Sequence, residues 1–365
     1  MLKRLFTFLM ACAATLGLSL GAAAAEPQKL ATGWLDEHEA FVMWLAKEKG
    51  WDKEAGLDVE MQLYASGITM LDGLRRGEWV FGGMGALPAM LGHLRLGISV
   101  IGIANDESLC NAVLLTRNSP IASVRKARKD FPNILGDAAS VKGKTFYVNN
   151  GTSAHYALYA WLKALGLSLD DVKLRNVDQG QALAALRDGS LDGGAAIWAP
   201  QLFSARAEGY PVAATVHDSG ATIPVVLVAE TAYAKARPEV AARFLAVYLR
   251  AADFVRAQPA DSLVADYQRF CASFGSRKCD AELARNDLRE HPLFSLPEQL
   301  SLFTSINSDP SLARKWMMDM AAFSHAVGQI TDKELEQVKN ADYVTDSYLR
   351  LIDPETLKVN AGSPK

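Results

Sequence analysis

The chain has 365 residues, half of them hydrophobic, and its 38 basic and 41 acidic side chains give a formal net charge of −3 at pH 7. A mildly acidic chain without a basic block lacks the positive surface that attracts nucleic acids and anionic membranes, so we expect neither as a partner. At roughly 100–200 residues per domain, the length suggests two domains.

The N-terminal segment, residues 1–25, has the pattern of an export signal. Lys3 and Arg4 precede a long apolar run that ends in the small residues Ala23 and Ala25. This order predicts cleavage before Glu26 and a periplasmic product, and it disfavours the alternative of a retained transmembrane helix.

A lipid anchor at Cys12 is a further interpretation of the same segment. Met10 fits a lipobox poorly, and the apolar run continues well past the cysteine. We therefore expect no lipidation, because such motifs must fit their context.

Five landmarks occur twice in the chain, in the same order. The first copy contains Trp44-Leu45, Gly56-Leu57, Leu74-Arg75-Arg76-Gly77, Gly82-Gly83 and Pro88, and the second contains Trp161-Leu162, Gly166-Leu167, Leu186-Arg187-Asp188-Gly189, Gly193-Gly194 and Pro200. Self-similarity of this kind indicates two related structural units.

Each unit is predicted to alternate strands with helices. In chain order, the expected elements are strands at 29–32, 57–64 and 79–82 with helices at 39–49 and 69–76, then strands at 145–149, 172–177 and 193–198 with helices at 154–165 and 180–188. This alternation implies a mostly parallel sheet, so each unit should form an α/β lobe.

The remaining segments connect and cover the lobes. The apolar runs 112–117 and 222–229 are predicted to cross between the lobes. The chain beyond residue 231 is predicted to form mostly helices that return to pack on the first lobe. The expected domains are the signal 1–25, a first lobe of residues 26–113 with 230–365, and a second lobe of residues 114–229.

A cleft between the lobes is the expected ligand site, because open α/β sheets bind ligands beyond the carboxyl ends of their strands and hinged lobes can close around a solute. The loops expected to line it contain neither Lys nor Arg. They are 33–39, 65–69, 84–87, 149–155, 178–181 and 196–201.

Loop 149–155 links a strand to a helix and carries Gly151, Thr152, Ser153 and His155. Glycine permits close approach of a ligand, and the free N–H groups of a helix start suit an anionic group. An ordinary helix cap is the alternative, and for His155 a structural role is as plausible as ligand contact.

Two tryptophans are candidates for walls of the cleft. Trp198 ends the last strand of the second unit, and Trp34 lies in the first loop of the first unit. An indole there offers a flat surface and one N–H donor, whereas core packing is the alternative for both residues.

Acidic residues crowd the first loop at Asp36, Glu37 and Glu39, and Asp106 and Glu107 lie near a crossing segment. They suit an ammonium or guanidinium group if they face the cleft, but exposed acids are common. One histidine between Glu37 and Glu39 is a weak metal signal, so we expect neither a metal nor a cofactor.

Three cysteines follow the signal. Cys271 and Cys279 are close in sequence, and an oxidising compartment permits a disulfide between them, although two unpaired thiols are nearly as plausible. Cys110 has no evident partner and is expected to be buried.

The second unit resembles the solute-binding proteins of nitrate, sulfonate and taurine ABC transporters. The resemblance is carried by Asn150-Gly151-Thr152-Ser153-Ala154-His155-Tyr156, Leu191-Asp192-Gly193 and Trp198-Ala199-Pro200, and it covers roughly residues 30–257. It implies the type II periplasmic binding protein fold: α/β and two-lobed, each lobe a mixed, mostly parallel sheet with flanking helices, with extra C-terminal helices.

The same resemblance implies a monomeric binding protein that captures a small polar solute, of sulfonate or taurine type, and delivers it to a permease and ATPase. Thr152, Ser153 and His155 would then line the anionic end, with Trp198 as a wall. Ala86, which we expect to contact the ligand, and Pro224 depart from taurine binders, which carry a hydroxyl residue and an aspartate there. First-lobe contacts would come instead from Trp34, Asp36 or Asn111.

Two alternatives remain open. The same fold could bind a cationic or neutral nitrogen compound, such as an amine, guanidine or pyrimidine. An enzyme of the pyrimidine-synthesis type is the other, but the export signal and the absence of a catalytic triad order, a zinc motif or a CxxC pair argue against it.

Overall fold

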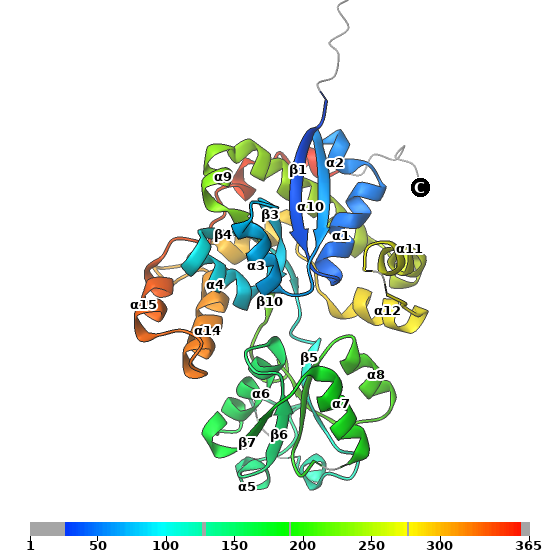
Figure 1. Cartoon of the computed structure of the whole chain (residues 1–365), viewed down its shortest axis with the longest axis vertical. Helices are drawn as coiled ribbons and strands as arrows, with labels where there is room; N and C mark the ends of the chain where they lie inside the picture. The colour runs from blue at the N-terminus through cyan, green and yellow to red at the C-terminus, as the bar shows by residue number, and fades with distance from the viewer. Residues whose placement is uncertain (1–25, 126–128, 190, 276, 359–365) are drawn as a thin grey trace, which may run out of the picture.

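The computed structural model describes residues 26–125, 129–189, 191–275 and 277–358, and it places them in two lobes, each built around a five-stranded sheet (Figure 1). The predicted export signal and Cys12 lie outside the described residues. Among the residues that are described, no helix is long and apolar enough to cross a membrane.

The sheet of the first lobe has the strand order β2-β1-β3-β10-β4. Its strands are β1 (Gln28–Trp34), β2 (Leu57–Leu63), β3 (Phe81–Gly85), β4 (Ile98–Asp106) and β10 (Pro224–Glu230). Strand β1 pairs parallel with β2 and β3, whereas β10 runs antiparallel to β3 and β4.

The sheet of the second lobe repeats this plan in the order β7-β6-β8-β5-β9. Its strands are β5 (Asn111–Leu115), β6 (Thr145–Val148), β7 (Lys173–Asn176), β8 (Gly194–Trp198) and β9 (Val212–Thr215). Strand β6 is parallel to β7 and β8, and β5 is antiparallel to β8 and β9. The predicted α/β class with mixed sheets is therefore confirmed.

The repeated glycine pairs mark places where neighbouring strands approach closely. A Cβ atom at Gly82 would lie 2.2 Å from the carbonyl oxygen of Gly33, and one at Gly194 would lie 2.2 Å from that of Leu114. A methyl group cannot occupy either position without moving a strand, which explains why both units carry Gly-Gly there.

Helices cover both sheets. Those of the first unit are α1 (His38–Glu48), α2 (Trp51–Glu54), α3 (Gly67–Arg75) and α4 (Ala86–Leu96), and those of the second are α5 (Ala138–Val141), α6 (Ser153–Ala164), α7 (Gln179–Asp188) and α8 (Gln201–Ala207). The predicted helices match α1, α3, α6 and α7 to within two residues at each end. Helices α4 and α8, which follow the third strand of each unit, were not predicted.

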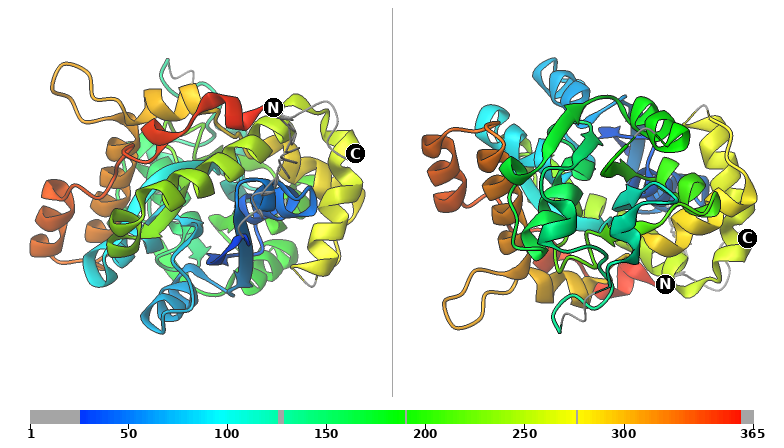
Figure 2. Two further views of the ribbon diagram at one scale, coloured as in Figure 1. Left: turned by 90° about the horizontal axis from the view of Figure 1, so that it is seen from above. Right: turned by 90° about the horizontal axis from the view of Figure 1, so that it is seen from below.

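The C-terminal part is helical, as expected. It contains α9 (Thr231–Ala236), α10 (Pro238–Ala257), α11 (Ala260–Ser273), α12 (Ala281–Glu290), α13 (Leu296–Phe303), α14 (Leu312–Ala326) and α15 (Asp332–Asn340). Seen from below, these yellow and orange helices lie on opposite sides of the green second lobe (Figure 2).

The predicted crossing segments are wrong. Residues 112–115 lie within β5 of the second sheet and residues 224–229 within β10 of the first, so the chain crosses at 107–110 and 216–223 instead. The two crossings hydrogen-bond each other, from the Glu107 N–H to the Ile223 carbonyl at 2.9 Å and from the His217 N–H to the Ser108 carbonyl at 3.1 Å. Apolar runs favour buried strands, whereas the short crossings are turns that need little apolar surface.

C-terminal helices also contact the second lobe directly. The ring of Phe323 on α14 lies 5.3 Å from each of the rings of His155, Tyr156 and Tyr159 on α6. On the other side, Arg206 of α8 forms an ion pair with Glu290 of α12 at 2.6 Å. The lobes are therefore held together by two lateral contacts in addition to the crossings.

Candidate functional site

A cavity of about 500 Å³ lies between the two lobes. Its walls come from loops of both sheets, from the crossing segment around Glu107, and from the C-terminal part of the chain at Arg277 and Asp287. The cavity is therefore at the carboxyl ends of the strands, where the fold predicts it.

Eight of the ten residues proposed from the sequence line this cavity. They are Asp36, Glu37, Ala86, Asn111, Gly151, Thr152, Ser153 and Trp198. The backbone of Trp198 is held in place because its main-chain N–H donates to the side-chain oxygen of Gln179 at 2.8 Å. Gly151 has a φ of 77°, a left-handed conformation that favours glycine.

Trp34 does not line the cavity, and the prediction for it is corrected. Strand β1 extends through residue 34, so the side chain points into the core, where it is 0 % exposed. Its ring stacks on Tyr248 at 6.3 Å, and its indole N–H donates to the Thr32 hydroxyl at 2.7 Å.

His155 also lies behind the cavity wall and is 3 % exposed. Its Nδ1 atom accepts a hydrogen bond from the Gly151 N–H at 3.1 Å, and burial lowers its pKa to about 4. In this structure His155 is a neutral side chain that fixes the loop before α6.

The sequence reasoning missed the residues that the C-terminal helices bring to the cavity. Tyr267, Arg277, Asp287 and His291 line it although they are more than 200 residues from the first loop. No local pattern marks them, because only the packing of α11 and α12 against α1 places them there.

Arg277 is the single Lys or Arg side chain among the described lining residues, and it is already paired. Its Nε atom donates to the Asp36 carboxylate at 2.6 Å, with both side chains about one-quarter exposed. The loops themselves lack Lys and Arg, but the completed cavity contains this partly buried ion pair.

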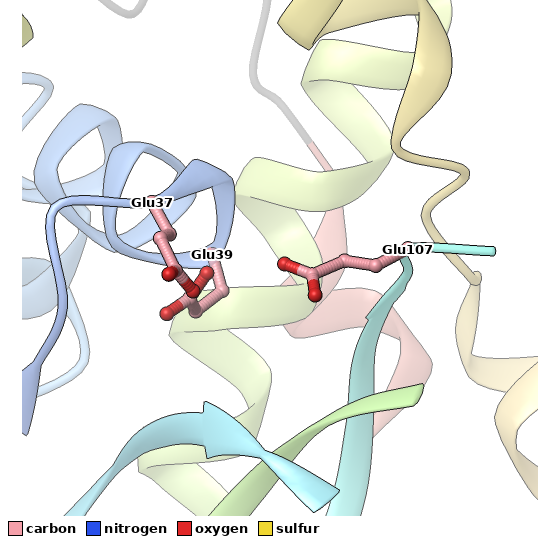
Figure 3. A group of neighbouring side chains, drawn as sticks. All are labelled: Glu37, Glu39 and Glu107. Atoms are coloured by element: carbon pink, nitrogen blue, oxygen red, sulfur yellow. The ribbon is translucent and has the colours of Figure 1, made fainter. Parts of the chain in front are cut away.

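Three carboxylates gather beside this pair and point toward one another: Glu37, Glu39 and Glu107 (Figure 3). One oxygen atom from each of the three carboxylates lies within 4.8 Å of the other two. Glu37 is the N-cap residue of α1 but makes no side-chain cap, so its carboxylate is free to turn inward. Glu39 lies in the first turn of α1, where the helix dipole favours a negative group.

Burial raises the pKa of each of these carboxyl groups. Burial and the charges of Asp36 and Asp287 raise the pKa of Glu37 to about 7. The pKa values of Glu39 and Glu107 lie well above their ordinary value, again through burial first and then through the charge of Glu37. The cluster therefore holds protons near neutral pH that a bound cation would displace.

This cluster predicts a pH dependence of stability. The unfolded chain releases the Glu37 proton near its ordinary pKa of 4.5, whereas the folded protein holds it to about pH 7. The folded state therefore binds more protons in this window, and Glu37 lowers stability progressively as pH rises from about 4.5 to 7. Replacing Glu37 by glutamine should remove this loss.

The check is urea unfolding of the wild-type protein and Glu37→Gln from pH 4.5 to 8. At about 1.4 kcal/mol per pKa unit, with allowance for water at this partly exposed residue, the variant should gain on the order of 1–2 kcal/mol by pH 7.5. The difference between the two proteins cancels the opposite contributions of buried histidines. A constant difference across this range would contradict the shifted pKa.

Three carboxylates of this kind can hold either a hard metal ion or an organic cation. Oxygen ligands suit Ca²⁺, Mg²⁺ or Mn²⁺, and the same oxygens accept hydrogen bonds from ammonium or guanidinium groups. The expectation of no metal thus stays a prediction.

Cys271 and Cys279 are separate thiols in this structure, and the neighbouring Cys279 thiol raises the pKa of Cys271. The predicted disulfide is not formed here, but the proximity of the two thiols keeps it a prediction for oxidising conditions. Cys110 is buried, as expected, and its thiol donates to the Glu290 carbonyl at 3.3 Å.

Comparison with known sequences gives a consistent set of relatives. A profile of the NMT1-like family matches residues 23–267. A putative ABC transporter periplasmic binding protein of Brachyspira hyodysenteriae is 29% identical over 212 residues, which cover 57% of this chain and 60% of that protein. The taurine-binding periplasmic protein of Escherichia coli is 26% identical over 195 residues, 53% of this chain and 56% of the other. The chain thus spans about 60% of the length of these curated relatives.

Solved structures share the fold at lower sequence identity. The periplasmic aliphatic sulphonate binding protein of Escherichia coli superimposes with a TM-score of 0.67 at 18% identity, over 86% of this chain and 97% of the other. The alkanesulfonate-binding protein of Xanthomonas axonopodis pv. citri bound to MOPS gives a TM-score of 0.60 at 18% identity, over 86% and 99%. At this identity the likeness shows the type II binding-protein fold alone.

Proposed function

The chain belongs to the NMT1-like family, and on this premise we propose that it is the substrate-binding component of an ABC importer whose cleft captures a small organic solute with a cationic nitrogen group. We choose a cationic ligand because acidic residues outnumber Lys and Arg among the described residues that line the cavity. The general role in solute transport is supported by relatives named as an ABC transporter periplasmic binding protein, a taurine-binding protein and a sulphonate-binding protein.

The cavity contains more acidic than basic residues. Asp36, Glu37, Glu107 and Asp287 line it, and Arg277 is the single Lys or Arg among its described lining residues. Arg277 is paired with Asp36, so among the described residues Glu37 and Glu107 have no ion-pair partner of their own beside Glu39. A cationic solute can replace the protons that these acids hold near neutral pH, whereas an anion gains nothing from them.

An anionic ligand of sulfonate type has weaker support. The N–H of Gly151 already donates to His155, and the Thr152 hydroxyl donates to the Asn149 carbonyl at 2.7 Å. The remaining N–H groups at the start of α6 can still attract a carboxylate or sulfonate. A zwitterion, with its anionic end at Thr152 and Ser153 and its cationic end at the acids, is therefore our second candidate.

Delivery to a permease and ATPase, a periplasmic location and a monomeric state belong to the same proposal. Relatives named as periplasmic binding proteins support the delivery to a transporter and the periplasmic location. Export would rest on the signal pattern of residues 1–25. An enzymatic role has no support in this family of binding proteins.

The test is a thermal-shift panel on residues 26–365 with amines, guanidines, pyrimidines, zwitterions, sulfonates and nitrate. A ligand at 100 times its Kd should add roughly 2.7 kcal/mol of stability. We expect nitrogen cations or zwitterions to raise the melting temperature. A shift with simple sulfonates or nitrate alone would contradict the cationic ligand while leaving the transport role intact.

Replacing Trp198 by alanine should weaken binding of the best ligand in that panel by roughly tenfold or more, because the cavity loses an aromatic wall. Isothermal titration calorimetry measures the change. Trp316→Ala, on α14 away from the cavity lining, is the matched control and should bind normally. Normal binding by Trp198→Ala would assign this side chain to packing only.

A further inference from the structure

Glu39 is a carboxylate that the fold buries without a partner. The side chain is 0 % exposed, and neither of its oxygen atoms has a hydrogen-bond partner in another residue. Space for it exists because residue 83 is glycine: a Cβ atom at Gly83 would lie 2.8 Å from Cγ of Glu39. Burying an ionised carboxylate without donors is unfavourable, so this position favours a cationic or donor group beside Glu39.

The partner must approach from the cavity. Glu37 and Glu107 line the cavity, and the buried carboxylate of Glu39 lies beside theirs (Figure 3). Among the described residues, no side chain or backbone N–H donates to the carboxylates of Glu37 or Glu107 either. Of the other charged groups nearby, Asp36 and Arg277 are paired with each other, and Asp287 adds a further acid to the cavity.

The chemistry of these three carboxylates favours some classes of cation over others. A quaternary ammonium has no N–H to donate and is normally held by an aromatic cage, whereas Trp198 and Tyr267 are the only Trp, Tyr or Phe residues among the described lining residues. Guanidinium and amidinium groups are planar and present paired N–H donors that match carboxylates two at a time. Three unpartnered carboxylates fit such a group better than a single point charge.

We propose that Glu37, Glu39 and Glu107 bind the guanidinium or amidinium end of the transported solute, with Glu39 as the buried acceptor. This assignment rests on the proposed function, because it names the class of cation that the cleft takes. The rest of the solute would extend into the cavity of about 500 Å³ toward Trp198.

The experiment is calorimetric titration at pH 7 with agmatine and benzamidine as probes, choline as a cation without N–H donors, and CaCl₂ or MnCl₂ as metal ions. Glu39→Gln and Glu107→Gln are compared with the wild-type protein. Glu60→Gln is the matched control, since Glu60 is half exposed on β2 and paired with Lys29. Circular dichroism and melting curves verify folding, and Glu39→Gln should be at least as stable as wild type because it removes a buried acid.

We expect agmatine or benzamidine to bind, and Glu39→Gln and Glu107→Gln to lose roughly tenfold or more in affinity, with Glu60→Gln unchanged. Titration in buffers of different ionisation enthalpy should detect protons released on binding, with fewer released by Glu39→Gln. Choline and the metal ions should not compete.

Other results overturn the assignment in distinguishable ways. Equal binding of choline would remove the requirement for N–H donors and leave a cationic ligand in place. Binding of Ca²⁺ or Mn²⁺ that depends on Glu39 would make the cluster a metal site. Probe binding that is indifferent to both variants would place the cation elsewhere. If no nitrogen cation binds while sulfonates do, the proposed cationic function fails as well.

Discussion

Replacing Phe323 by alanine should destabilise the protein by about 3–5 kcal/mol and loosen the contact between its lobes. Phe323 is 0 % exposed on α14, and its ring packs against His155, Tyr156 and Tyr159 of α6. The substitution leaves a cavity in an aromatic cluster that joins the C-terminal helices to the second lobe. Urea unfolding measures the loss of stability, and small-angle X-ray scattering measures the radius of gyration.

Phe146→Ala is the matched control for this variant. Phe146 is equally buried, but its ring packs on Trp161 within the core of the second lobe. It should lower stability by a similar amount without changing the radius of gyration. If Phe323→Ala leaves the radius unchanged as well, the contact between α14 and α6 does not hold the lobes together.

Replacing Arg277 by alanine should cost about 2 kcal/mol of stability and should not weaken the binding of a cationic solute. The substitution leaves Asp36 without its 2.6 Å partner in a partly buried position, which accounts for the loss of stability. It also makes the cavity more negative, so a cation should bind as tightly as before or more tightly.

This variant separates the two classes of ligand. An anionic solute would use Arg277 as its counter-charge, and its binding would be lost. Calorimetry with agmatine and with taurine measures the binding of a cation and of a sulfonate. The control for removing an arginine is Arg75→Ala, because Arg75 is exposed on α3 and forms an ion pair with Asp72. Loss of agmatine binding with Arg277→Ala would contradict a site built from unpaired acids.

The repeat was the most informative feature of the sequence. It predicted two α/β units, and the sheets confirm them in matching strand orders. It worked because glycine pairs at residues 82–83 and 193–194 are required by close strand contacts, so both copies keep them. Helical periodicity placed α1, α3, α6 and α7 because their apolar faces are local properties.

The crossing segments show where local reasoning fails. An apolar run at 112–115 and another at 224–229 were equally compatible with a crossing or a buried strand, and pairing between distant strands made them β5 and β10. The prediction that Trp34 faces the cleft was wrong for a related reason. Pairing with β2 continues two residues beyond the predicted strand, through Gly33 and Trp34, and turns the Trp34 side chain from the cleft into the core.

By itself, the sequence determined the α/β class, the two units and most of the loops that line the cleft, because these depend on periodicity, glycine placement and strand ends. Only the tertiary structure decided the electrostatics of the site. The partnerless Glu39, its approach to Glu107 and the neutralisation of Asp36 by Arg277 all join residues far apart in the chain. Coulomb interactions and desolvation depend on distance in space and on burial, and neither is written in local sequence.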